Sequence, residues 1–376
     1  MQSHPYKVTT TYLADGRELL YFDDTEPYLT GGALRKLKDD RQLSATSNFS
    51  EMRKDPLSGK WVVYAAHRMQ RTFMPPANEN PLAPTVPGQL PTEIPADDYD
   101  IAVFENRFPS FSLNAALDDS TLNLPTSAPA VPRLPAQARC EVVCFTSDAT
   151  KSFRDLTPHR VRTVIEVWAH RTEALSKIDG VESVYPFENR GVEIGVTLQH
   201  PHGQIYSYPF IPPQLESMIE QCRGYFAWHG RDLFDDLLRA EHELEVRIVT
   251  RGTHFTTLVP PAAKWPLEVM IIPHRKVRDF TDLSNEEKDE LAVLYLDLLQ
   301  RVDQFYPGVD KTPYIAAWNQ TPANVASHEM RFHLNLFSLM RAPHRMKYLA
   351  GSESGMGVWI NDTTPERIAA RLREVS

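Results

Sequence analysis

The 376-residue sequence predicts a mixed α+β protein in which one structural unit occurs twice and both copies contribute strands to one continuous sheet. The main observation is an internal similarity between two stretches, which begin at Glu141 and at Glu268. Each has a short apolar run, a polar link that ends in Phe-x-Asp-Leu, a helical segment and two further apolar runs. Any protein with this order of strands and helices shows some similarity of this kind, so chance similarity remains the alternative.

The segments before the first copy are typical of strands joined by long connections. Residues 1–25 predict a β-hairpin, because two apolar runs flank Asp15-Gly16, a favoured tight-turn pair. Short strands are expected at 61–66 and 101–106. The other segments are rich in turn-forming residues and are expected to be irregular: residues 26–50, residues 74–95 with seven of the 30 prolines, and residues 114–138.

Each copy contains a well-marked helix start. In the first, Thr157 precedes Pro158, and proline is favoured at the first helical position. In the second, Ser284 is followed three residues later by Glu287, which is the pattern of a capping box. We therefore expect one long helix after each of these N-cap residues.

Two apolar runs follow each helix, and we expect them to pair as strands. The second run of the first pair aligns with the second run of the other, residues 202–207 with residues 333–338. His202 therefore corresponds to His333.

Composition limits the classes of partner. The formal net charge of −9 argues against non-specific binding to nucleic acid or to anionic membranes, but it does not exclude a local phosphate site. There is no apolar run of about 18 residues, and the first ten residues lack a signal-peptide pattern. The three cysteines have no framework spacing, so we expect no disulfides and a cytoplasmic location.

The strongest chemical signal is the pentad His200-Pro201-His202-Gly203-Gln204, at the head of an apolar strand. Because alternate side chains of an extended chain point to opposite faces, we expect His200, His202 and Gln204 to converge on one side. Gly203 is expected to leave room beside the imidazole for a bulky group.

This trio suits nucleotidyl transfer. A neutral imidazole can attack phosphorus with one nitrogen while the other donates to a backbone carbonyl, which would place a nucleotide on His202. The amide of Gln204 can donate to a phosphoryl oxygen, and because it does not titrate it favours transfer over hydrolysis. The alternative is a pair of structural or metal-binding histidines, but two ligands alone make a poor zinc site.

At these residues the sequence resembles the galactose-1-phosphate uridylyltransferases of the histidine-triad superfamily. The resemblance extends over most of residues 50–365. It is carried by four motifs: Asp55-Pro56-Leu57-Ser58-Gly59-Lys60-Trp61 with His67, Arg68 and Arg71; Phe104-Glu105-Asn106-Arg107-Phe108-Pro109; Phe187-Glu188-Asn189 through the pentad; and Lys347-Tyr348-Leu349-Ala350-Gly351-Ser352-Glu353.

The resemblance implies a histidine-triad-like fold, in which two tandem repeats form one continuous, largely antiparallel sheet, a half-barrel flanked by helices. Residues 1–225 would be the first repeat with an amino-terminal extension and the pentad. Residues 226–376 would be the second repeat with the hexose-phosphate segment. It also implies a homodimer whose sites are built from both subunits.

The reaction that the resemblance implies is ping-pong transfer. His202 would take uridylyl from UDP-glucose, release glucose 1-phosphate and then pass the uridylyl group to galactose 1-phosphate. His200 and Gln204 would assist. On the nucleotide side, the implied contacts are Arg68 and Arg71 to phosphates, Asn106 and Asn189 to ribose or phosphate, Thr197 to phosphate and Phe104 to the base.

Lys347 and Glu353 would hold the hexose phosphate and its hydroxyls. Taken without the resemblance, each of these two residues reads as an ordinary surface charge, and Phe104 as plain core. Other activities remain alternatives: a nucleotide-sugar or dinucleoside polyphosphate phosphorylase, a triad hydrolase, or a nucleotide-binding module without turnover.

The sequence departs from the family at its metal sites. Many members have a zinc site with a Cys-x-x-Cys pair and a histidine, where this chain has Asn80, Ala83 and Ala149; of that set only His200 remains. At the second metal site of some members this chain has Asn319, His333 and Asn335. A specific site needs three or four ligands, so we expect neither zinc nor iron. His200 is then expected to support the catalytic loop by hydrogen bonding, and His333 to be structural.

Overall fold

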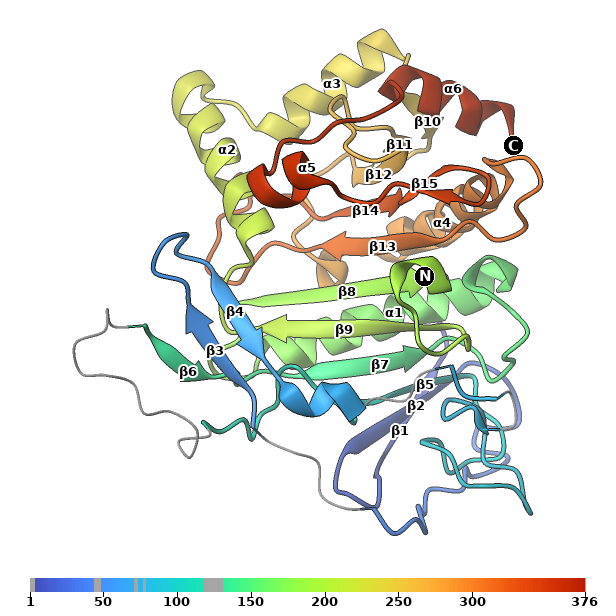
Figure 1. Ribbon diagram of the computed structural model, residues 1–376. Coiled ribbons are helices and arrows are strands. Elements are labelled where there is room, and N and C mark those ends of the chain that lie inside the picture. The colour runs from blue at the N-terminus through green and yellow to red at the C-terminus, as the bar shows by residue number, and fades with distance from the viewer. Residues whose placement is uncertain (1–3, 44–48, 71–73, 77–78, 118–130, 376) are drawn as a thin grey trace.

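The computed structural model describes residues 4–43, 49–70, 74–76, 79–117 and 131–375 (Figure 1). An eleven-stranded sheet passes through both halves of the chain, and all of its neighbouring strands are antiparallel. In spatial order the strands are β1 (Lys7–Tyr12), β2 (Glu18–Asp23), β5 (Ile101–Glu105), β7 (Cys140–Cys144), β9 (His202–Tyr208), β8 (Ser183–Arg190), β13 (Tyr314–Asn319), β14 (His333–Ser338), β12 (Leu267–Pro273), β11 (Phe255–Leu258) and β10 (Ile248–Arg251).

Helices flank this sheet, and two small sheets accompany it. The helices are α1 (Pro158–Ser176), α2 (Pro213–His229), α3 (Leu233–Leu244), α4 (Asn285–Gln304), α5 (Gly351–Met356) and α6 (Pro365–Glu374). The small sheets are β4 (Trp61–Tyr64), β3 (Glu51–Lys54) and β6 (Arg133–Pro135), and β15 (Met340–Ala342) with β16 (Arg345–Met346). The fold expectation is confirmed: the protein is α+β, with a large, unclosed antiparallel sheet flanked by helices.

The two repeats meet where β8 pairs with β13. On one face of this junction α1 and α4 lie side by side, behind the sheet in Figure 1. The two Phe-x-Asp-Leu links place Phe153 and Phe280 in the same buried aromatic cluster, with ring centroids 6.0 and 5.2 Å from that of Trp168. Trp318 of β13 completes the cluster at 5.7 Å from Trp168. The two similar segments therefore pack together in one shared core.

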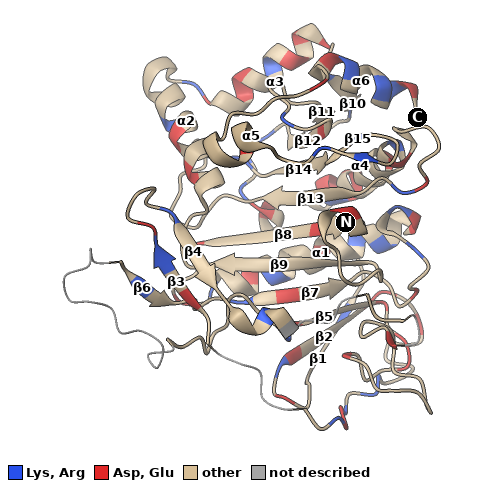
Figure 2. Ribbon diagram, viewed as in Figure 1, with Lys and Arg blue, Asp and Glu red and all other residues tan. Residues whose placement is uncertain are grey.

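The helix starts also agree with the sequence. The Thr157 side chain caps α1 by accepting from the backbone N–H of Arg160, and Ser284 forms a capping box with Glu287 at α4. Figure 2 shows acidic and basic residues interspersed along the helices of both halves. Among the described residues, no helix combines the length and apolar character needed to cross a bilayer.

Two expectations need correction. The strand expected at 61–66 ends at Tyr64, and a 3-10 helix follows at Ala66–Gln70. Residues 114–138 contain the strand β6, because this segment pairs with β3.

No expectation covered the helices α2, α3, α5 and α6 or the strands β3, β10, β11, β15 and β16. The helices α3 and α6 do carry local signals, because Asp232 and Thr364 precede them as N-cap residues. The strands are short and depend on tertiary pairing.

Candidate active site

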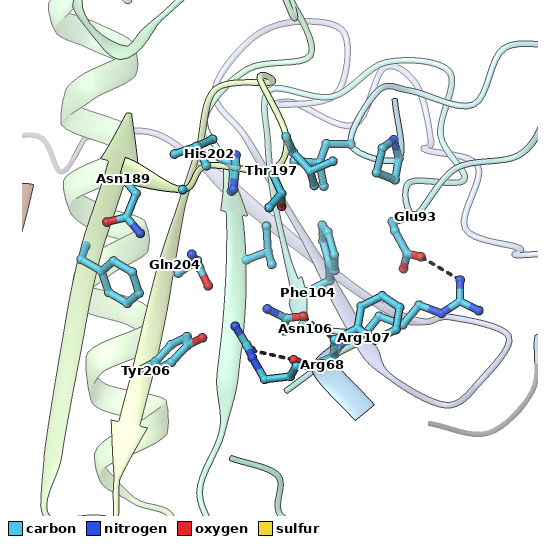
Figure 3. A pocket seen from close by; sticks show the side chains of 18 residues that line it. Arg68, Glu93, Phe104, Asn106, Arg107, Asn189, Thr197, His202, Gln204 and Tyr206 are labelled. Carbon is cyan, nitrogen blue, oxygen red and sulfur yellow. Dashed lines mark hydrogen bonds and ion pairs between the residues drawn. The ribbon is translucent and has the colours of Figure 1, made fainter. Parts of the chain in front are cut away.

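The pentad lies where strand β9 begins, between β7 and β8, and β8 is the strand that meets the second repeat. His202 is the first residue of β9 and pairs with Cys144 of β7, while Gln204 lies between Val142 of β7 and Phe187 of β8. Along β9 the side chains alternate, so that Gly203, Ile205 and Ser207 are buried and the others are partly exposed. His202 and Gln204 therefore project from the face opposite α1, as Figure 3 shows.

Both side chains line a cavity of about 310 Å³ (Figure 3). Five more residues that the sequence analysis selects line the same cavity: Arg68, Phe104, Asn106, Asn189 and Thr197. They come from segments far apart in the chain, and the pairing of β5, β7, β9 and β8 brings most of them together.

The orientation of His202 is fixed by its own backbone. Its Nδ1 lies 2.7 Å from the carbonyl oxygen of His200, and because a carbonyl only accepts, Nδ1 carries the proton. Nε2 is then the nitrogen with the free lone pair, and among the described residues it has no hydrogen-bond partner. Burial lowers the pKa of His202, although the hydrogen bond to the His200 carbonyl opposes this shift. The ring is therefore neutral near pH 7 and can act as a nucleophile.

Two of the lining side chains, Arg68 and Asn106, are positioned by hydrogen bonds with the backbone of Phe108. The Arg68 guanidinium donates through Nη1 to the carbonyl of Phe108 at 2.8 Å. The Oδ1 of Asn106 accepts the backbone N–H of Phe108 at 2.9 Å, so its amide nitrogen stays available to a ligand. The guanidinium of Arg68 and the side-chain amides of Asn106, Asn189 and Gln204 suit the oxygens of a phosphate or a ribose.

Two expectations about the pentad are wrong. His200 does not share the cavity with His202 and Gln204, because β9 begins only at His202 and the alternation does not extend back to His200. Its ring is 3% exposed and contacts Asn80, Tyr99 and Thr146. It borders an adjoining cavity of about 330 Å³, which His202 also lines.

Gly203 leaves no room beside the imidazole. A Cβ at this position would lie 2.7 Å from the Phe145 ring and 2.9 Å from the carbonyl oxygen of Phe187, on the opposite face of β9. Glycine is needed here because the core packs directly against the backbone.

Two selected residues do not line the cavity, and a third cannot be placed. Lys347 and Glu353 lie near β16 and in α5, where they form an ion pair of 3.2 Å and are mostly buried. Hydrogen bonding with Lys347 lowers the pKa of Glu353. Neither lines the cavity of this chain. Arg71 lies outside the described residues.

Glu93 and Tyr206 also line the cavity, although neither was expected there. Glu93 forms ion pairs with Arg17, Arg41 and Arg107 at 2.5, 3.0 and 3.6 Å at the edge of the cavity. It comes from the proline-rich segment, where no local pattern marks it. Tyr206 follows His202 and Gln204 at the two-residue spacing of a strand, so the alternation could have identified it.

The residues at the family's first metal site do not fit a metal ion. The amide nitrogen of Asn80 lies 2.9 Å from Nδ1 of His200, and Nε2 lies 2.8 Å from the Thr146 carbonyl oxygen. Both ring nitrogens therefore have hydrogen-bond partners, and Asn80 presents N–H groups rather than a thiolate. Within the described ranges, no three His, Cys, Asp or Glu side chains are grouped so that they could hold a metal ion.

In the second repeat, the position that corresponds to His202 has no cavity before it, among the described residues. His333 donates from Nδ1 to the carbonyl of Arg331 at 2.8 Å, the same contact that His202 makes. However, its ring is 1% exposed and lies 5.5 Å from the ring of Phe234 in α3. Burial lowers the pKa of His333 to about 4. Helix α3 thus covers in the second repeat the space that is a cavity in the first.

Comparison with known proteins agrees with this geometry. Residues 41–212 match the family model of the galactose-1-phosphate uridyl transferase N-terminal domain, and residues 218–376 match that of its C-terminal domain. A galactose-1-phosphate uridylyltransferase of Streptomyces lividans is 40% identical, with 98% of each chain covered. One of Thermotoga maritima is 34% identical over 86% of this chain and 98% of its own.

Two solved structures with similar folds agree with the family match. A structure described as that of a uridylyltransferase matches with a TM-score of 0.74 and 28% identity, over 86% of this chain and 98% of that chain. An ADP-glucose phosphorylase from Arabidopsis thaliana has a TM-score of 0.64 at 22% identity over 87% of this chain and 99% of its own, which is a likeness of fold. From the two family models and the relatives, the chain belongs to the galactose-1-phosphate uridylyltransferase family.

Proposed function

We propose that this chain is a UDP-glucose:hexose-1-phosphate uridylyltransferase that works through a covalent uridylyl group on His202. One observation carries the proposal. The Nδ1 proton of His202 is held by the His200 carbonyl, so the lone pair of Nε2 is directed into a cavity with the functional groups that a nucleotide needs. The shared family supports galactose 1-phosphate as the acceptor.

The chemistry needs no proton transfer. The Nε2 lone pair attacks the α-phosphorus of UDP-glucose, a P–N bond forms, and the bond from phosphorus to the bridging oxygen breaks. Glucose 1-phosphate leaves with that electron pair. The ring becomes cationic, and its Nδ1–H bond to the His200 carbonyl strengthens as the charge develops. In the second step an oxygen of galactose 1-phosphate attacks phosphorus and the P–N electrons return to Nε2.

Gln204 is suited to stabilise this transfer. Its side chain lies next to His202 on the cavity face, where its amide N–H groups can meet a non-bridging phosphoryl oxygen. A residue that cannot titrate cannot activate water, so the uridylyl group persists until a sugar phosphate arrives.

The first prediction concerns the nucleophile. His202→Asn removes the attacking lone pair, so exchange of labelled glucose 1-phosphate into UDP-glucose, measured without a second acceptor, should fall to background. His344→Asn is a matched control on an exposed residue with φ of 59°, a conformation that asparagine tolerates. Exchange that survives His202→Asn would contradict the assignment. A wild-type protein that releases UDP when inorganic phosphate is supplied, but forms no UDP-galactose from galactose 1-phosphate, would instead be a phosphorylase. One that binds nucleotide without any turnover would be a nucleotide-binding module.

We also propose a homodimer with shared sites. Lys347 and Glu353 stand apart from the cavity of their own chain, yet the resemblance assigns them to the hexose phosphate. A second copy could supply this segment to the cavity.

Complementation tests this arrangement. His202→Asn and Lys347→Met should each be inactive alone. Co-expressed chains should regain about a quarter of wild-type activity, because half of randomly formed dimers contain one intact site. No recovery, with both variants folded and dimeric, would place Lys347 in the site of its own chain or outside it.

Neither zinc nor iron is required in this proposal. Two observations support a metal-free protein. At the family's first metal site, both ring nitrogens of His200 already have hydrogen-bond partners. At the second, an amide side chain, Asn319, lies opposite the buried His333. Protein purified from medium with both metals should contain well under one metal ion per chain, and its activity should survive dialysis against a chelator. Stoichiometric metal with loss of activity on removal would refute it.

We propose a cytoplasmic location as well. Cys140, Cys144 and Cys222 are all free and buried, which suits a reducing compartment. Fractionation of the source cells tests this, and recovery outside the cytoplasmic fraction would contradict it.

A further inference from the structure

The side chain of Asn80 has only one orientation that fits its surroundings. Its Oδ1 lies 3.0 Å from the backbone nitrogen of Leu82, which only donates. Its Nδ2 therefore faces Nδ1 of His200, at 2.9 Å. Because an amide NH₂ group only donates, Nδ1 of His200 must be the acceptor and carries no proton.

The other nitrogen of His200 must then carry the proton. Its Nε2 lies 2.8 Å from the Thr146 carbonyl oxygen and 2.7 Å from the Tyr99 hydroxyl. The Tyr99 hydroxyl is 2.8 Å from the carbonyl of Leu82 and donates to it, so its oxygen can accept from His200. The one Nε2–H of His200 thus faces two acceptors, and each group in the network has a consistent role as donor or acceptor.

Most of the network is buried, which makes it restrictive. Tyr99 is 1% exposed, His200 is 3% exposed and Asn80 is partly exposed, so the His200 ring itself has little contact with water. The two histidines are consequently held in opposite tautomers. His200 carries its proton on Nε2, and His202 carries its proton on Nδ1 and gives it to the His200 carbonyl.

We propose that Asn80 is a positioning residue, which locks the His200 ring in the Nε2–H tautomer and thereby holds the carbonyl that keeps His202 reactive. This inference rests on the proposed role of His202 as nucleophile. The ring and the carbonyl belong to one residue, so a ring that is anchored at both nitrogens also restrains that residue's backbone, and loss of one anchor loosens the peptide group that follows. Asn80 donates an N–H to the lone pair of Nδ1 and so fixes the ring of His200. A metal ion at this place would fix the ring through the same lone pair.

The position of the proton can be read directly. In wild-type protein with ¹⁵N-labelled histidine, spectra of the ring nitrogens should show His200 protonated at Nε2 and His202 at Nδ1, with signals assigned from His200→Gln and His202→Asn. A wild-type His200 protonated at Nδ1 would overturn the proposal without any variant. The reading is made on unliganded protein, so failure of the uridylyl transfer itself would leave it unaffected.

Asn80→Asp is the sharpest variant, because it keeps the shape and replaces the donor by an acceptor. Nδ1 of His200 should become protonated, while Nε2 keeps its proton because the Thr146 carbonyl only accepts. The rate of glucose 1-phosphate exchange should fall by about tenfold to a hundredfold, with KM for UDP-glucose little changed. Asn114→Asp, on an exposed residue, makes the same charge change and should alter neither the spectrum nor the rate.

Asn80→Ser restores a donor and should keep the wild-type tautomer with a smaller loss of rate. An unchanged His200 spectrum in Asn80→Asp, or a loss confined to KM, would contradict the proposal. If Asn80→Asp does not fold, the wild-type and Asn80→Ser spectra decide the matter by the same criterion.

Discussion

The hydrogen bond from Nδ1 of His202 to the carbonyl of His200 is the interaction on which the proposed chemistry depends. It fixes which nitrogen has a free lone pair and directs that nitrogen into the cavity. The chain bends at His200 and Pro201, just before β9. This bend brings the carbonyl of His200 close to the ring of His202. The close packing of Phe145 against Gly203 holds the strand behind it.

The same contact occurs in both repeats, but only one copy has a cavity. His333 donates to Arg331 as His202 donates to His200, and each histidine begins an inner strand of its repeat. The repeats differ in what covers them. In the second, Phe234 of α3 lies against the imidazole, whereas in the first the space before it is open. Under the proposed function, the first repeat provides the reactive site and the second repeat its structural counterpart.

Much of this could be predicted from the sequence because it depends on local rules. The caps at Thr157 and Ser284 and the alternation along β9 are such features. The error over His200 arose from extending the alternation before the strand begins. Glu93 and Tyr99 could not be found, because their roles arise from tertiary packing of an irregular segment. The distance of Lys347 and Glu353 from the cavity likewise depends on how the second repeat folds, and their role and the division at 225/226 stay predictions.

The most direct test of the central claim is the intact mass of the protein after incubation with UDP-glucose. The account predicts an increase by one uridylyl group per site, located on the peptide that contains His202, and its loss when galactose 1-phosphate is added. An unchanged mass under conditions of full turnover, or a uridylyl group on any other residue, would contradict it.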